Sequence, residues 1–119
     1  MATSGTTPTE GDIDNSFGSV AVLFSPHRTR LVLSGEVDDS FGQELADAVS
    51  ECATAGVPVE VDARTVAFID SAGAAHLARL AQALPVRVIQ PPDVMQFVMS
   101  VSGLDRSVEI LDHCPDFPA

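Results

Sequence analysis

Apolar segments with two different periods alternate along residues 19–111, and this alternation constrains the fold more than any other feature of the sequence. Short runs rich in β-branched residues predict strands, whereas longer segments with an apolar residue every three or four positions predict helices. In chain order the segments predict β-β-α-β-α-β-α-β. Strands that alternate with helices predict an α/β fold whose later strands are parallel, with the helices packed on the sheet.

The first two predicted strands form a hairpin, and each later strand follows a predicted helix. The strands are expected over Ser19–Phe24, Arg30–Ser34, Val57–Asp62 extended by Val66–Ile69, Pro85–Gln90 and Ser107–Leu111. Asp39 or Ser40 is expected to cap the first helix and Asp93 the third, because Asp and Ser side chains accept hydrogen bonds from free helix N–H groups.

Three helices are expected between these strands, each with an apolar face. The apolar residues are Phe41, Leu45, Ala48, Val49 and Cys52 in the first helix, which ends at Gly56; Leu77, Leu80, Ala81 and Leu84 in the second, over Ala72–Leu84; and Val94, Phe97, Val98 and Val101 in the third, over residues 93–102 and closed by Gly103. Their recurrence at three- and four-residue steps is typical of amphipathic helices.

Length and composition indicate one globular domain. The chain has 119 residues, 45% of them hydrophobic and 19% charged, which is enough to build a core. Residues 1–16 are polar and lack periodicity, so we expect a flexible N-terminal tail, a folded domain over 17–112 and a C-terminal tail over 113–119. Because no spanning segment or signal-peptide pattern is visible, we expect a cytoplasmic protein.

The charge balance is strongly acidic, with a net charge of −11 and only six Lys plus Arg. Such a surface repels phosphate backbones and anionic headgroups, so we expect neither a nucleic-acid partner nor membrane insertion. Cys52 is expected in the core, and Cys114 is expected to be incidental near a loose C-terminus. Neither has a histidine at zinc-ligand spacing, so we expect no metal and no cofactor.

An enzyme is disfavoured by the residue pattern. His27, His76 and His113 form no recognisable catalytic arrangement, and there is no phosphate-binding loop, GxGxxG or HExxH motif. His76 and Arg79 lie on the solvent side of the second predicted helix. They either decorate that exposed face or contact a partner.

One segment, AFIDSAGAAHL at residues 67–77, ends a buried strand with a carboxylate and a hydroxyl. Asp70 or Ser71 is a good N-cap for the next helix, which is the purely structural interpretation. The small residues after Ser71, however, leave its hydroxyl uncovered, and open α/β sheets usually present their sites past the ends of strands. A helix N-terminus also accommodates an added phosphate. Both interpretations remain open on the residues alone.

Three segments, taken in order, resemble the STAS domains of the bacterial anti-sigma factor antagonists. FIDSAG is similar to the family's strand–DSSG–helix signature, GEVD at residues 35–38 is similar to its GELD segment, and QPP followed by VMQFVMSVSGL resembles its third helix. The resemblance covers about residues 19–111. The sequence departs from the signature at Ala72, where the family has a second serine, and at Ala74-Ala75, where it has Leu-Gly.

The resemblance implies a STAS-like mixed sheet of about five strands and a role as an anti-sigma factor antagonist. In that family the anti-sigma factor, often also a serine kinase, phosphorylates the serine that follows the aspartate, which is Ser71 here. The unphosphorylated form would bind the anti-sigma factor and free its sigma factor for transcription. Expected partner-binding residues are Asp38, Asp70, Ser71, Ala72, Gly73, His76 and Arg79. Asp38 alternatively serves as a turn residue, and Gly73 as backbone geometry.

A second interpretation keeps the STAS fold without the switch. STAS domains also serve as scaffold subunits of lipid-transport ATPases and of large sensory assemblies, so the resemblance is compatible with such a role.

Overall fold

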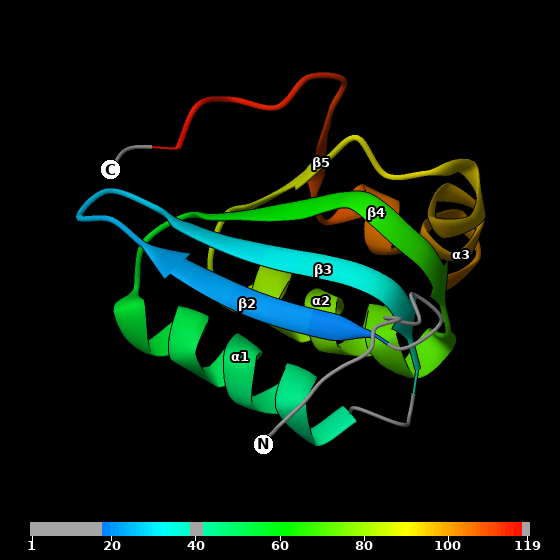
Figure 1. Ribbon diagram of the computed structural model, residues 1–119, viewed down its shortest axis with the longest axis horizontal. Helices are drawn as coiled ribbons and strands as arrows, with labels where there is room; N and C mark the ends of the chain where they lie inside the picture. Colours follow the sequence, from blue (N-terminus) through cyan, green and yellow to red (C-terminus); the bar gives the residue numbers. More distant parts are fainter. Residues whose placement is uncertain (1–17, 39–41, 118–119) are drawn as a thin grey trace, which may run out of the picture.

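The computed structural model describes residues 18–38 and 42–117, which form a five-stranded sheet in the order β2-β3-β4-β5-β6 (Figure 1). The elements are β2 (Ser19–Phe24), β3 (Thr29–Val37), α1 (Gly42–Ala55), β4 (Val59–Ile69), α2 (Ser71–Ala83), β5 (Val86–Ile89), α3 (Asp93–Ser102), the 3-10 turn η2 (Leu104–Arg106) and β6 (Glu109–Leu111). β2 runs antiparallel to β3, and all the other neighbouring strands are parallel. The predicted order and fold class are confirmed. The expected tail over 1–16 and the expected caps Asp39 and Ser40 lie outside the described residues.

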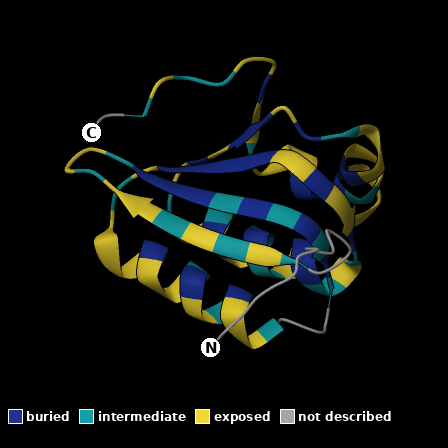
Figure 2. Cartoon of the chain, in the orientation of Figure 1, coloured by how far each residue is buried: buried dark blue, intermediate teal, exposed yellow. Residues whose placement is uncertain are grey.

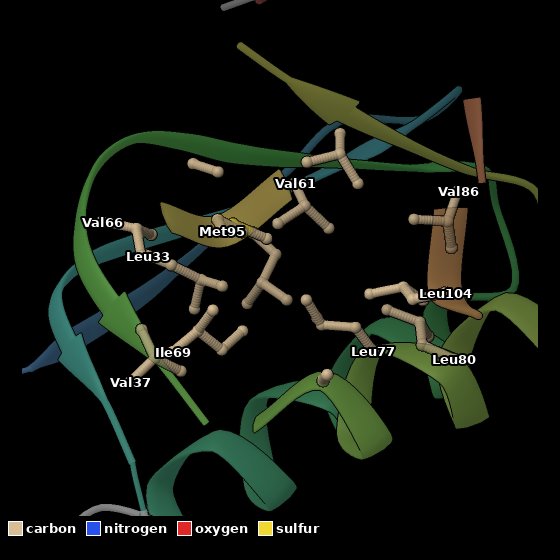
Figure 3. Close-up of a cluster of buried hydrophobic side chains, with 14 of the residues drawn as sticks. Leu33, Val37, Val61, Val66, Ile69, Leu77, Leu80, Val86, Met95 and Leu104 are labelled. Atoms are coloured by element: carbon tan, nitrogen blue, oxygen red, sulfur yellow. The ribbon is translucent and has the colours of Figure 1, made fainter. Parts of the chain in front are cut away.

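The core lies between the sheet and the helices (Figure 3). Leu33 and Val61 contribute from the sheet, and Leu77 and Leu80 contribute from α2, all fully or almost fully buried. Of the predicted apolar face of α1, Leu45, Ala48 and Cys52 are buried and Val49 is partly buried, whereas Phe41 lies outside the described residues. Figure 2 shows the consequence for α1, whose buried side faces the sheet while its other side is exposed.

Cys52 is a core residue, as expected from the sequence. Its side chain is completely buried, and this burial raises the pKa of the thiol to about 11, with a smaller contribution from the charge of Glu51. The thiol therefore stays protonated at neutral pH and packs as a small apolar group.

β4 is one continuous strand of 11 residues where the sequence predicts two runs. It pairs with the nine-residue β3 through two register shifts, one between Val32 and Ser34 and one between Gly35 and Glu36. Each shift adds a residue to β4, and such a bulge turns the following side chains. The residues of β4 that face the core are therefore Val59, Val61, Ala63, Val66 and Ile69.

α3 begins differently from the sequence prediction. Its N-cap is Pro92, which makes no side-chain capping bond, and Asp93 is the first helical residue. The predicted Asp93 cap is therefore wrong, because a capping side chain must belong to the residue before the first helical turn. The negative charge of the Asp93 carboxylate still interacts favourably with the free N–H groups at the start of α3. Gly103 closes α3 in a left-handed conformation, as expected.

The apolar residues of α3 divide between two faces. Met95 and Met99 are fully buried in the core, and Val98 is partly buried against it. The other apolar residues face solvent, with exposures of 41% for Val94, 71% for Phe97 and 73% for Val101. The helix thus has two apolar stripes: Met95 and Met99 face the core, and Val94, Phe97 and Val101 face solvent.

Buried charges lie on the face of the sheet opposite the helices. Arg30 and Glu60 alternate with core-facing neighbours along their strands, so their side chains point away from the core. The Nη2 atom of Arg30 lies 2.6 Å from Oε1 of Glu60, and Nε of Arg28 lies 3.4 Å from Oε2 of the same carboxylate. Only 7% of the Arg30 side chain and 3% of the Glu60 side chain are exposed.

The C-terminal segment covers these charges. After β6 the chain runs back over the sheet toward the β2–β3 hairpin (Figure 1). Arg30 donates to the carbonyl of Pro115 at 2.7 Å and to Sγ of Cys114 at 3.5 Å, and Arg28 donates to the carbonyl of Asp116. The Phe117 ring lies 5.2 Å from the guanidinium of Arg30. Within the expected C-terminal tail, residues 114–117 are therefore held by specific contacts, and Cys114 is part of them.

The interaction between Asp62 and Arg64 predicts a pH-dependent contribution to the stability of the fold. Nε of Arg64 donates to Asp62 at 3.0 Å, and this hydrogen bond lowers the pKa of Asp62 from its ordinary value of 3.8 although burial opposes the shift. A carboxyl group whose pKa is lower in the folded state than in the unfolded state stabilises the fold at any pH above its unfolded-state pKa. This stabilisation is lost as the pH falls through the folded-state pKa. Asp62→Asn is therefore expected to lower the urea midpoint at neutral pH, and the difference from wild type should vanish at strongly acidic pH. Asp47→Asn, at an exposed carboxylate, is the control; an equal pH dependence in both variants would contradict the assignment.

Candidate functional site

The turn between β4 and α2 positions the candidate site. Asp70 is the N-cap of α2, with an extended backbone, and its Oδ1 accepts from the N–H of Gly73 at 2.8 Å. Its carbonyl accepts from the N–H of Ala74 at 3.0 Å. Of the two possible caps, the structure uses Asp70. Ser71 is therefore the first residue of α2, and it is exposed.

A backbone hydrogen bond ties this turn to the neighbouring strand. The N–H of Asp70 donates to the carbonyl of Val37 at the end of β3, at 3.2 Å. Because β3 and β4 are parallel, their carboxyl ends lie at the same edge of the sheet. Asp38, which directly follows Val37 and is half-buried, is therefore brought to the same end of the sheet as Asp70 and Ser71.

Gly73 is the point of closest approach between α2 and the sheet. It is buried, and a Cβ added there would lie 3.0 Å from Cγ1 of Ile69 and 3.0 Å from the carbonyl oxygen of Val37. A larger residue would push the start of α2 away from the strand ends. Gly73 therefore contributes the geometry of the site and offers no side chain to a partner.

The surroundings of Ser71 are bare and acidic. Residues 72–75 carry no side chain larger than a methyl group, and the nearest ionisable residue along the chain is Asp70. The first turn of α2 contains no basic residue. The hydroxyl of Ser71 is thus open to another protein, while the amide end of the helix favours negative charge at this position.

The other two predicted partner-binding residues form a separate pair. Nη2 of Arg79 lies 2.7 Å from Nδ1 of His76, with Arg79 exposed and His76 half-buried. Both line a groove of about 280 Å³ between α1 and α2, together with Ala46, Val49 and Ala53 of α1. At 1.5 Å rise per residue, Arg79 lies about 12 Å along the helix from Ser71. The structure thus places Asp38, Asp70, Ser71 and Ala72 together and His76 and Arg79 apart from them.

Residues 18–38 and 42–117 contain neither a metal-binding cluster nor a membrane-spanning helix. No group of three or more His, Cys, Asp or Glu residues in these ranges is arranged to hold a metal ion. No helix in the same ranges is long and apolar enough to cross a membrane.

The chain belongs to the STAS domain family. The family model described as "Mlab, STAS domain" matches residues 20–112, which include all the described strands and helices except the first residue of β2. The resemblance in the strand–DSAG–helix segment is thereby confirmed at the level of the family. A comparison with curated proteins found no significant match.

Solved structures with the same fold include two described as anti-sigma factor antagonists and one described as a Bacillus cell fate determinant. The protein from Mycobacterium paratuberculosis has 18% identity and a TM-score of 0.73, over 83% of this chain and 89% of its own. Unphosphorylated SpoIIAA has 18% identity and a TM-score of 0.64, over 77% and 87%. The Bacillus cell fate determinant SpoIIAA in the phosphorylated form has 17% identity and a TM-score of 0.62, over 77% and 90%. At this identity the likeness shows the fold.

Proposed function

We propose that this protein is an anti-sigma factor antagonist that binds an anti-sigma factor at the start of α2 and is switched off by phosphorylation of Ser71. The observation that carries the proposal is the exposed Ser71 hydroxyl at the first position of α2, on a turn held by the Asp70 cap and by the close approach at Gly73. The shared fold of the antagonists supports it. Its role is binding, without catalysis by the chain itself, and it acts in the cytoplasm.

The phosphoryl group would come from ATP bound to the partner kinase. The Oγ of Ser71 attacks the γ-phosphorus, the bond to the β-phosphate oxygen breaks, and ADP and the hydroxyl proton leave. A phosphoserine adds about −1.5 to −2 charges at neutral pH. The helix amides accommodate this charge in the free protein, so the domain does not have to refold.

The switch would act through the bound state. A partner that covers Ser71 must remove water from the added phosphate, beside the carboxylates of Asp38 and Asp70. Burying an unpaired charge in this way costs several kcal/mol, and about 3 kcal/mol already corresponds to a 100-fold loss of affinity. One modification is therefore large enough to release the anti-sigma factor, which then returns to its sigma factor.

The proposal predicts opposite results for two substitutions at one position. Ser71→Asp is expected to weaken binding to the cognate anti-sigma factor by about 100-fold, because a carboxylate enters the contact. Ser71→Ala should bind like the wild type and resist release by ATP. Isothermal calorimetry measures both, with Ser107→Asp as a control for added charge at an exposed serine. Equal affinity of wild type and Ser71→Asp, or phosphate found by mass spectrometry only at other residues after incubation with the kinase, would refute the switch.

A non-switching scaffold subunit of a lipid-transport ATPase or a sensory complex is the second candidate. The observation that favours it is Ala72, which replaces the second serine of the family signature, together with the family model that matches. Co-purification with an ATPase subunit and an unmodified Ser71 in the cell would support this candidate over the first.

A further inference from the structure

Within residues 18–38 and 42–117, the outer edge of β2 pairs with no further strand. Among the described residues β2 pairs with β3 alone, so every second residue of β2 directs its backbone N–H and C=O groups away from the sheet. Its sequence, SVAVLF, contains no charged residue and no proline. Charged residues and prolines are what natural proteins commonly place on edge strands to prevent pairing with other chains. This edge is therefore competent to accept a further strand.

A hollow lies directly beside this edge. It has a volume of about 420 Å³ and is lined by Phe24 of β2 and by Ser50, Glu51, Thr54 and Ala55 of α1. Val20 and Val22 are partly buried against the core, so by alternation Phe24 points to the same side, and 55% of it is exposed. A strand added to β2 would place every second side chain over α1 and this hollow. Hydrogen bonds along an edge combined with pockets for alternate side chains are the features of recognition by strand addition.

The charges around the hollow indicate what kind of strand fits. Glu44 and Glu51 are exposed and lie two turns apart on α1, and Asp47 is exposed between them. The cations nearest to this region are engaged elsewhere: Arg28 with Glu60 and Asp116, and Arg79 with His76 on the α2 side of α1. An incoming basic side chain would therefore meet carboxylates. A second copy of this chain would bring the same carboxylates and another net charge of −11 to the contact.

We propose that the free edge of β2 is a docking site for an extended segment of a partner protein that carries alternating apolar and basic side chains on its α1-facing side. The apolar side chain enters the hollow beside Phe24 and Ala55, and the next side chain on that face, Lys or Arg, pairs with Glu51. This site is separate from Ser71 and does not depend on the switch.

A synthetic peptide tests the edge directly. Isotope-labelled full-length protein is titrated with the octapeptide Thr-Val-Thr-Lys-Thr-Val-Thr-Lys, with both ends blocked, and backbone amide shifts are followed by NMR. We expect shifts in β2 and in the C-terminal half of α1, and slower hydrogen exchange at alternate amides of β2. The same peptide with Glu in place of Lys should not bind. An absence of β2 shifts at millimolar peptide, or equal binding of the two peptides, would overturn the proposal.

Matched charge reversals separate the site from general electrostatics. Glu51→Lys is expected to lower the affinity for the basic peptide by about five-fold or more, since an attractive pair at the surface becomes a repulsive one. Glu109→Lys makes the same change in net charge on β6, at the opposite edge of the sheet, and should leave binding within about two-fold of wild type. Equal losses in both variants would contradict the site.

Two further measurements distinguish the occupant and the function. Ser71→Asp should bind the peptide like the wild type. Evidence against the phosphorylation switch at Ser71 would therefore leave the docking site on β2 standing, and evidence against the docking site would leave the switch standing. Sedimentation that shows a dimer of the wild type, lost in Leu23→Lys, would assign the edge to a second copy and overturn the partner proposed here.

Discussion

Replacing Glu60 with Gln is expected to lower the free energy of unfolding by about 3–5 kcal/mol, because it leaves the guanidinium of Arg30 buried without its counter-charge. Arg30 donates to Oε1 of Glu60 through both Nε and Nη2, at 3.2 Å and 2.6 Å, so the substitution removes the charge that receives both bonds. Urea denaturation at neutral pH measures the loss. Because Arg30 also holds the C-terminal segment, the amides of Cys114, Asp116 and Phe117 should exchange faster in this variant.

The control for this prediction is the exposed pair of Arg87 and Glu109, whose side chains are 53% and 63% exposed. Glu109→Gln removes the same charge from a solvated pair and should cost less than about 1 kcal/mol. The double variant Arg30→Met/Glu60→Leu should regain much of the loss, since it removes both charges of the buried pair. Arg28 also loses its contact with the Glu60 carboxylate, but 28% of its side chain is exposed to water. A cost for Glu60→Gln as small as that of Glu109→Gln would show that water reaches Arg30.

Gly73→Val is expected to destabilise the protein by about 3 kcal/mol, because its side chain would overlap the groups that α2 packs against. Even the first added carbon lies 3.0 Å from the carbonyl oxygen of Val37. This oxygen also accepts the hydrogen bond from Asp70, so it cannot move away without breaking the link between β3 and the turn. The displaced start of α2 should carry Ser71 with it, so the proposed binding of an anti-sigma factor should fall together with stability.

Gly42→Val is the matched control, since Gly42 also lies in the first turn of a helix and an added Cβ there meets nothing within 4 Å. Its effect should stay within about 0.5 kcal/mol, as is usual for surface substitutions. Chemical denaturation compares the two variants. A Gly73→Val protein as stable as Gly42→Val would mean that α2 can shift at no cost, which would contradict the role given to Gly73.

The contrast between α1 and α3 shows why part of the fold was predictable. In α1 one stripe is apolar and the other side carries the carboxylates of Glu44, Asp47 and Glu51, so periodicity identified the buried residues Leu45, Ala48 and Cys52. In α3 two apolar stripes compete, and the buried one is formed by Met95 and Met99. Periodicity cannot choose between two apolar stripes, because the choice depends on which fills the space left by the sheet and α2.

The candidate site shows the same division. Residue types within one short segment predicted an uncovered Ser71 hydroxyl and a helix cap at either Asp70 or Ser71, and the structure assigns the cap to Asp70. The requirement for Gly73 depends on Val37, which lies 36 positions earlier (73 − 37), and no local pattern indicates this contact. The open edge of β2 likewise becomes visible only when the order of the strands is known.

By itself the sequence determined the order of strands and helices, the end of each helix at a glycine in α1 and α3, and the position of Ser71 after a buried strand. These features depend on neighbours along the chain, where capping, backbone preference and periodicity act. Only the tertiary structure decided which stripe of α3 is buried, that Arg30 and Glu60 form a buried pair, and that α2 touches β3 at Gly73. Each of these depends on distances between segments far apart in sequence, which are set by the packing of the whole core.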